Sequence, residues 1–85
     1  MFYVYVLYSK TLDKKYVGST SDLRQRVSEH NSGYSQFTKR GIPWRLLYYE
    51  AFLDKHDALI EEKFLKSGKG RDRLKYLFTH SLLRI

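Results

Sequence analysis

The sequence predicts an α/β fold of the α+β type, with its strands and helices in the order β-β-α-β-α-α. Two runs of aromatic and β-branched residues are joined by a polar connection, which is typical of a β-hairpin. A third such run follows Pro43, the only proline of the chain. Two further segments carry the capping and stop signals of helices, and a third has the apolar side of a short helix, formed by Leu74, Leu77 and Phe78. The 85 residues suffice for one domain, spanning residues 1–85, with one modest core.

The hairpin is predicted from residues 2–8 and from Tyr16-Val17. Apolar side chains occupy both faces of the first strand, so we expect it in the middle of the sheet, covered on both sides. The second strand ends at Gly18, whose missing Cβ leaves room for a close approach of backbone or of a ligand such as a phosphate.

The first helix is predicted over residues 23–30. Thr20 or Ser21 is expected to cap this helix, and Asp22 suits its first turn. Residues 31–33, with the sequence Asn-Ser-Gly, supply a stop signal.

On a helical wheel, Leu23 and Val27 define the buried stripe of this first helix. Arg26 and His30 lie together on one flank of the stripe, and Arg24 lies on the opposite flank. Arg26 and His30 are therefore expected to act together, whereas Arg24 suits a surface contact or a backbone phosphate.

Residues 34–43 show no periodicity and suit a basic surface loop. In that loop Lys39 and Arg40 contact either a backbone phosphate or only solvent. Because Pro43 disfavours helix before it, residues 44–52 are predicted to form the third strand. The aromatic rings of this strand are expected in the core rather than as platforms for base stacking.

The second helix is predicted from Asp54 to residues 66–67, because Asp54 and Asp57 resemble a capping box. Gly68 and Gly70 are expected to stop it. A last short helix is then predicted over residues 71–77.

The second helix also carries two adjacent carboxylates, Glu61 and Glu62. Both fall between the apolar positions of the helical wheel, so periodicity does not decide which of them faces inward.

The net charge of +7 and the pI near 9.7 favour a polyanionic partner, with nucleic acid as the leading candidate. A basic surface that serves only solubility is the alternative. No apolar run approaches the 18 residues that a membrane span needs, and no cysteine is present to form disulfides or thiolate metal sites. We expect a cytoplasmic protein without a membrane partner, since the N-terminus also lacks the pattern of a signal peptide.

Several familiar catalytic sites are excluded by spacing. Residues 66–71 lack the spacing of a phosphate-binding loop and follow a helix rather than a strand. The three histidines show no short metal-ligand spacing, and no Ser/His/Asp order is compelling. The remaining tyrosines, arginine, histidine and glutamates are residue types that phosphodiester cleavage uses, with a base, positive charge and a carboxylate-bound metal. The alternative assigns the tyrosines to the core and Arg26 to a surface ion pair.

The sequence resembles the GIY-YIG nuclease superfamily, particularly its small single-domain bacterial members. The family arginine, ten positions after the tyrosine of the second triplet, falls at Arg26, and His30 follows one helical turn later. An Ala-Leu pair precedes the family's catalytic glutamate, which places that glutamate at Glu62. The resemblance covers nearly the whole chain. Its remaining matches are Tyr3-Val4-Tyr5, Tyr16-Val17-Gly18, residues 43–50 and Gly70-Arg71.

The resemblance implies a three-stranded antiparallel sheet flanked by helices and a metal-dependent DNA endonuclease. It implies that Glu62 holds one Mg²⁺ or Mn²⁺, that Tyr16 takes a proton from the attacking water and that Arg26 stabilises the developing charge. It also implies that Tyr5 and His30 orient water, phosphate or Tyr16. A free tyrosine has a pKa near 10, so a tyrosine base needs positive charge nearby. Contacts to DNA are expected from Arg24, Lys39, Arg40, Lys66 and Arg71.

The chain departs from the family pattern at two positions. Tyr3 replaces the glycine that usually opens the first triplet, and a strand residue suffices there. Ser19 stands where some repair members carry lysine, which removes one cation from the site. Arg26 and the metal would then carry more of the charge stabilisation.

Two other classes of function stay open. A non-catalytic nucleic-acid-binding module would keep the charge of +7 without needing Glu62, and a protein-interaction module would need neither. The resemblance leaves open the structure and sequence of the substrate, DNA against RNA, and the role in repair, restriction or homing. It also leaves open whether a partner protein or a homodimer is needed.

Overall fold

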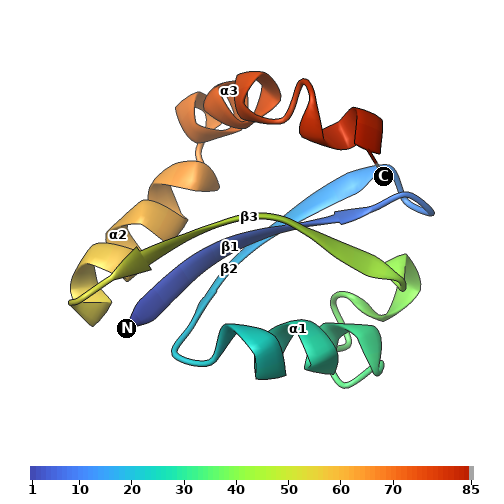
Figure 1. Cartoon of the computed structure of the whole chain (residues 1–85), viewed down its shortest axis with the longest axis horizontal. Coiled ribbons are helices and arrows are strands. Elements are labelled where there is room, and N and C mark those ends of the chain that lie inside the picture. Colours follow the sequence, from blue (N-terminus) through green and yellow to red (C-terminus); the bar gives the residue numbers. More distant parts are fainter. Residues whose placement is uncertain (85) are drawn as a thin grey trace.

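The computed structural model describes residues 1–84 and contains an antiparallel sheet with helices on both faces (Figure 1). The strands are β1 (Phe2–Ser9), β2 (Lys14–Thr20) and β3 (Trp44–Phe52), and the helices are α1 (Leu23–Asn31), α2 (Lys55–Leu65) and α3 (Gly68–Leu77). Short 3₁₀ turns cover Lys39–Gly41 and Ser81–Arg84. The predicted order β-β-α-β-α-α and the three-stranded antiparallel sheet are therefore confirmed. No helix in residues 1–84 is long and apolar enough to cross a membrane.

The middle strand is β1, in the spatial order β2-β1-β3. Its side chains alternate between two buried faces, with Val4 and Val6 on one and Tyr5 and Leu7 on the other. This burial confirms that the first strand is central and covered on both sides. It leaves β2 as an edge strand, to which helices from both faces of the sheet have access.

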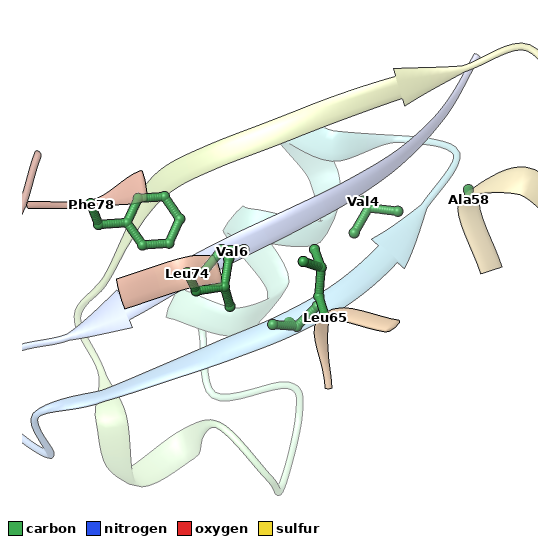
Figure 2. Close-up of a cluster of buried hydrophobic side chains, with 7 residues drawn as sticks. Val4, Val6, Ala58, Leu65, Leu74 and Phe78 are labelled. Carbon is green, nitrogen blue, oxygen red and sulfur yellow. The ribbon is translucent and has the colours of Figure 1, made fainter. Parts of the chain in front are cut away.

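One face of the sheet packs against α2 and α3. Figure 2 shows side chains from β1, α2, α3 and the residue after α3 gathered in one apolar cluster. The cluster attaches α2 to the sheet and so fixes the position of the carboxylates on this helix. Its labelled members are Val4, Val6, Ala58, Leu65, Leu74 and Phe78.

The opposite face of the sheet is covered by α1 and by the segment between α1 and β3 (Figure 1). Leu23 and Val27 pack against the buried residues of this face, as their helical spacing predicts. Trp44 is buried, but the Tyr49 side chain is 53% exposed. The expectation that the rings of the third strand lie in the core is therefore correct for Trp44 and wrong for Tyr49.

Asp22 is the N-cap of α1, whereas the sequence suggested Thr20 or Ser21. The Asp22 carboxylate accepts a hydrogen bond of 3.1 Å from the backbone N–H of Gln25. The Thr20 hydroxyl instead accepts one from the backbone N–H of Asp22, also at 3.1 Å. The Thr20 side chain therefore stabilises the turn before the helix, and the cap lies one position after Ser21.

The last helix, α3, begins at Gly68, three residues earlier than predicted, with Ser67 as its N-cap. Gly70 does not stop a helix but lies within α3. A Cβ at Gly70 would lie 2.5 Å from the Cα of Leu65, so only glycine lets α3 pack this closely against the end of α2. Glycine has a low helix propensity, so the sequence alone predicts a helix break at these glycines. In the structure, tertiary packing outweighs that propensity.

Candidate active site

The strand register brings Tyr5 and Tyr16 to the same face of the sheet. In the pairing of β1 with β2, Gly18 lies opposite Tyr5 and Tyr16 lies opposite Leu7. Tyr16 and Gly18 are two residues apart on β2, so Tyr16 lies on the same face of the sheet as Tyr5. The ring centroids of Tyr5 and Tyr16 are 6.4 Å apart. The two tyrosines of the sequence motifs are therefore neighbours under α1.

Gly18 makes room for the Tyr5 ring. A Cβ at position 18 would lie 2.6 Å from Cζ of Tyr5 and 3.1 Å from Cε1 of Tyr16. The close approach expected at this glycine is thus made by a side chain of the protein, and the place of its missing Cβ is taken by Tyr5.

Replacing Gly18 with alanine is expected to lower the free energy of unfolding by about 1 to 3 kcal/mol, the usual cost of overpacking. The added methyl group forces the Tyr5 ring away from its partners. Gly68 offers a matched control, because no atom lies within 4 Å of a Cβ at that position. Thermal melts should show a lower midpoint for Gly18→Ala and an unchanged or higher one for Gly68→Ala. Equal midpoints would show that Gly18 is not needed for packing.

His30 is fully buried and uses both of its ring nitrogens. Nε2 is hydrogen-bonded to the hydroxyl of Tyr5 at 2.9 Å, and Nδ1 to the hydroxyl of Thr38 at 2.7 Å. Its ring meets the Tyr16 ring edge-on, with centroids 4.9 Å apart. Burial and the nearby Arg26 lower the pKa of His30, so the imidazole is neutral at pH 7. His30 therefore connects the two tyrosines.

Thr38 belongs to this group, so the expectation that residues 34–43 form a surface loop is wrong for Thr38. Its side chain is fully buried, and its carbonyl accepts a 2.6 Å hydrogen bond from Nε1 of Trp44. Asn31 also binds Trp44, because its side-chain oxygen accepts a hydrogen bond of 2.6 Å from the backbone N–H of Trp44. Thr38 comes from the stretch without periodicity, and Asn31 was interpreted only as part of a helix stop signal, so the sequence did not point to these contacts.

Arg26 extends from α1 beside this group. Its Nη1 donates to Oε1 of Glu29 at 2.9 Å, and the side chain is 30% exposed. Burial raises the pKa of the Tyr5 hydroxyl to about 12, and the nearby Arg26 opposes that rise. Arg26 thus forms the surface ion pair that was the alternative to a role in phosphodiester cleavage. It also lies close to the Tyr5 hydroxyl.

Glu62 approaches β2 from the other face of the sheet. The Ser19 hydroxyl donates to Oε1 of Glu62 at 2.6 Å, and Nζ of Lys66 donates to Oε2 at 2.7 Å. Burial acts to raise the pKa of Glu62, but the hydrogen bonds from Lys66 and Ser19 outweigh it and lower that pKa. The carboxylate is therefore charged at neutral pH, and the Ser19 hydroxyl orients it.

Glu61 faces a different strand. It lines a hollow between α2 and β3 together with Glu50. A hydrogen bond with Glu50, together with burial, raises the pKa of Glu61 to about 7. The structure thus decides what periodicity left open, since Glu62 faces β2 and Glu61 faces β3.

The donors around Glu62 fit a hard divalent cation that keeps most of its own water. Magnesium is usually bound by one or two carboxylates, with water and substrate phosphates completing its coordination. Glu62 supplies one ionised carboxylate, with the Ser19 hydroxyl beside it. Among residues 1–84, no group of three or more histidine, aspartate or glutamate side chains gathers to form a metal cage. A metal here would depend on Glu62 and on substrate oxygens.

A basic groove of about 690 Å³ follows β2 on its α2 and α3 side. It contains two of the five cations predicted to contact DNA, Lys66 and Arg71, and it reaches Tyr16. Sequence reasoning missed its three other lysines, since two of them lie in or beside a hairpin turn that resembled ordinary solvated surface. These three are Lys14, Lys15 and Lys75.

The other three predicted DNA contacts lie outside the basic groove. Arg24 lines a separate hollow with Tyr3 and Tyr49, between α1 and β3. Lys39 and Arg40 are exposed in the 3₁₀ turn directly after Thr38, at the end of the buried histidine network. The structure therefore separates the five cations into three groups.

Comparison with known proteins adds independent findings. A family model described as the GIY-YIG catalytic domain matches residues 1–76. A UPF0213 protein of Pediococcus acidilactici is 43% identical over 96% of this chain and 86% of its own length. A UPF0213 protein of Streptococcus pyogenes is 42% identical over 92% of this chain and 86% of its own. The solution NMR structure of a UPF0213 protein from Bacillus halodurans superposes with a TM-score of 0.56 at 33% identity, covering 91% and 85% of the two chains.

Proposed function

The chain belongs to the GIY-YIG family, alongside the UPF0213 proteins, and from this membership we propose that it is a metal-dependent DNA endonuclease. One observation supports the proposal above the others. Tyr16 lies on the edge strand β2, and Glu62 reaches the same strand through its hydrogen bond with Ser19. An open basic groove along this strand contains Lys66, the partner of Glu62, and extends to Tyr16, so a phosphate bound in it would lie near both residues.

The roles divide according to exposure. Tyr16 is partly exposed and takes a proton from the attacking water. Arg26 offers two parallel N–H donors to the phosphate oxygens as negative charge builds on them. Glu62 holds one Mg²⁺ or Mn²⁺, which when bound polarises the phosphate and favours the deprotonated forms of nearby groups.

Tyr5 and His30 act as positioning residues. Tyr5 is 1% exposed and His30 is fully buried, so neither side chain is open to substrate. Of the three tasks that the family resemblance allowed them, orienting Tyr16 is the one that their burial favours. Hydrogen bonds with Thr38 and Tyr5 fix the His30 ring, and Tyr16 packs against that ring.

Replacing Tyr16 with phenylalanine is expected to lower the cleavage rate far more than it lowers stability. The Tyr16 ring and its contacts with His30 and Trp44 remain, and only the hydroxyl is lost. Losing one hydroxyl costs stability by about 1 to 3 kcal/mol even where a buried partner is left unpaired. Cleavage rates beside thermal melts separate the two effects. Loss of activity together with unfolding would instead assign Tyr16 to the core.

The proposal is tested by cleavage of a panel of labelled DNA structures, including single-stranded, branched and mismatched molecules. Cleavage is expected in Mg²⁺ or Mn²⁺ and absent in EDTA. It should be weak and poorly sequence-specific, because the lysine and arginine side chains of the basic groove suit contacts to phosphates, which carry no sequence information. Protein that leaves every structure uncut in both metals at stoichiometric amounts would contradict the proposal.

One observation favours a non-catalytic nucleic-acid-binding module as the second candidate. Both oxygens of Glu62 already accept hydrogen bonds, one of them from the charged Lys66. If that ion pair is the role of Glu62, the basic groove binds DNA without cutting it. Affinity that falls steeply with salt in the absence of any metal-dependent cleavage would identify this second function.

A further inference from the structure

We propose that the loop over residues 34–40 binds unpaired bases of single-stranded DNA beside the active site, by stacking them on Tyr34 and Phe37. The inference rests on the proposed function for its choice of nucleic acid, and it names the part of the substrate that the protein holds. The loop connects α1 to the 3₁₀ turn before β3 (Figure 1).

Two aromatic rings project from this loop into solvent. Phe37 is 93% exposed and Tyr34 is 77% exposed, so neither ring contributes appreciably to the core. Exposed apolar side chains are common singly, but here two rings three residues apart on one short loop are both open to a partner. Aromatic rings of this kind supply the platforms on which unpaired bases stack.

Hydrogen bonds at Tyr34 and at Thr38 anchor the loop that carries the two rings. The backbone N–H of Tyr34 donates to the carbonyl of Glu29 at 3.2 Å, which ties the start of the loop to α1. Thr38, the neighbour of Phe37, is fully buried and hydrogen-bonded to His30 and Trp44. An anchored loop with exposed rings loses little conformational freedom when a base stacks on it.

Charge selects the occupant. Lys39 and Arg40 lie two and three residues after Phe37, both are exposed, and the whole chain carries a net charge of +7. Rings followed by cations fit a single strand, which presents both bases and phosphates. A duplex offers the same phosphates but keeps its bases stacked inside.

The loop is also connected to the catalytic tyrosine. Thr38 binds His30, and the His30 ring packs edge-on against Tyr16 at 4.9 Å. A strand that stacks on Phe37 therefore lies next to the group that orients the proposed base. This placement leads us to expect a substrate with unpaired nucleotides close to the cleaved bond.

The test uses an oligothymidine that contains one 2-aminopurine, whose fluorescence is quenched when the base stacks, and a duplex of the same length. Binding is measured in EDTA, so that no result depends on cleavage. Phe37→Ala and Tyr34→Ala should each weaken single-strand binding on the order of ten-fold and reduce the quenching, with little change for the duplex. Phe37→Trp should retain both. Tyr76→Ala is the matched control, since this ring is 83% exposed but lies on α3 in a hollow with Arg73 and Leu77.

Unchanged single-strand affinity and quenching in Phe37→Ala would overturn the inference, and they are the result expected if the rings dock a protein instead. Absence of single-strand binding by the unmodified protein would overturn it as well. Ring-dependent binding without any cleavage would support the inference while contradicting the endonuclease proposal. Cleavage without ring-dependent binding would do the reverse.

Discussion

Replacing Glu62 with glutamine is expected to abolish metal-dependent cleavage while largely sparing DNA binding. Glutamine keeps the size of the side chain and an oxygen that can accept from Ser19, which donates to Oε1 of Glu62 at 2.6 Å. It loses the negative charge that a hard cation requires and the ion pair with Lys66 at 2.7 Å. The basic groove keeps all of its lysine and arginine side chains, with Lys66 released from its ion pair, so affinity for DNA should not fall.

Glu61→Gln is the matched control for this change. Glu61 is the next residue of the same helix, but it faces Glu50 on β3 rather than β2. The comparison uses single-turnover cleavage in Mn²⁺, together with binding in Ca²⁺ to suppress chemistry. If Glu61→Gln proved to be the damaging change and Glu62→Gln the harmless one, the assignment of the metal ligand would be wrong.

Arg26→Lys is expected to reduce the cleavage rate by about 10²-fold or more, the cost of removing one preorganised transition-state donor. Lysine keeps the charge but lacks the planar fork that grips two phosphate oxygens. The Arg26 guanidinium is held by Glu29 at 2.9 Å, so its orientation is set before substrate arrives. DNA affinity should be nearly unchanged, because the number of positive charges is the same.

Arg24 lies on the same helix and provides the control. Its side chain lines the hollow with Tyr3 and Tyr49, away from the tyrosine and histidine network. Arg24→Lys should keep the rate, and Arg24→Ala should at most weaken binding and reduce the salt slope by roughly one phosphate contact. The measurement is single-turnover cleavage with saturating protein, paired with binding at several salt concentrations. Equal rate losses from the two lysine substitutions would show that Arg26 is not the catalytic cation.

The parts of the fold that were predictable are those governed by local patterns. The alternation of Val4 and Val6 with Tyr5 and Leu7 gave a central strand with two buried faces. Helical spacing put Arg26 on the same flank of α1 as His30. The start of α3 was predicted wrongly, because Gly70 reads as a break in sequence and serves in the structure to let two helices touch.

The candidate site was predictable only where the spacing of a known family applies. That spacing pointed to Tyr16 and Glu62 on different elements, and the structure brings both to β2. It carried no information on Ser19 as the partner of Glu62 or on Thr38 as the partner of His30. Both are contacts between elements distant in the chain, and such contacts are decided by packing rather than by local pattern.

The central claim, that Glu62 holds a divalent metal at the edge strand β2, is tested most directly by paramagnetic broadening of amide NMR signals. Mn²⁺ added far below the protein concentration broadens only signals near the bound ion, so even weak binding is located without substrate. If Glu62 holds the ion, broadening is selective for Gly18, Ser19 and Glu62 in the unmodified protein and in Glu61→Gln, and it is lost in Glu62→Gln. Broadening that persists in Glu62→Gln, or that centres on Glu50 and Glu61 instead, would show that Glu62 is not the metal ligand.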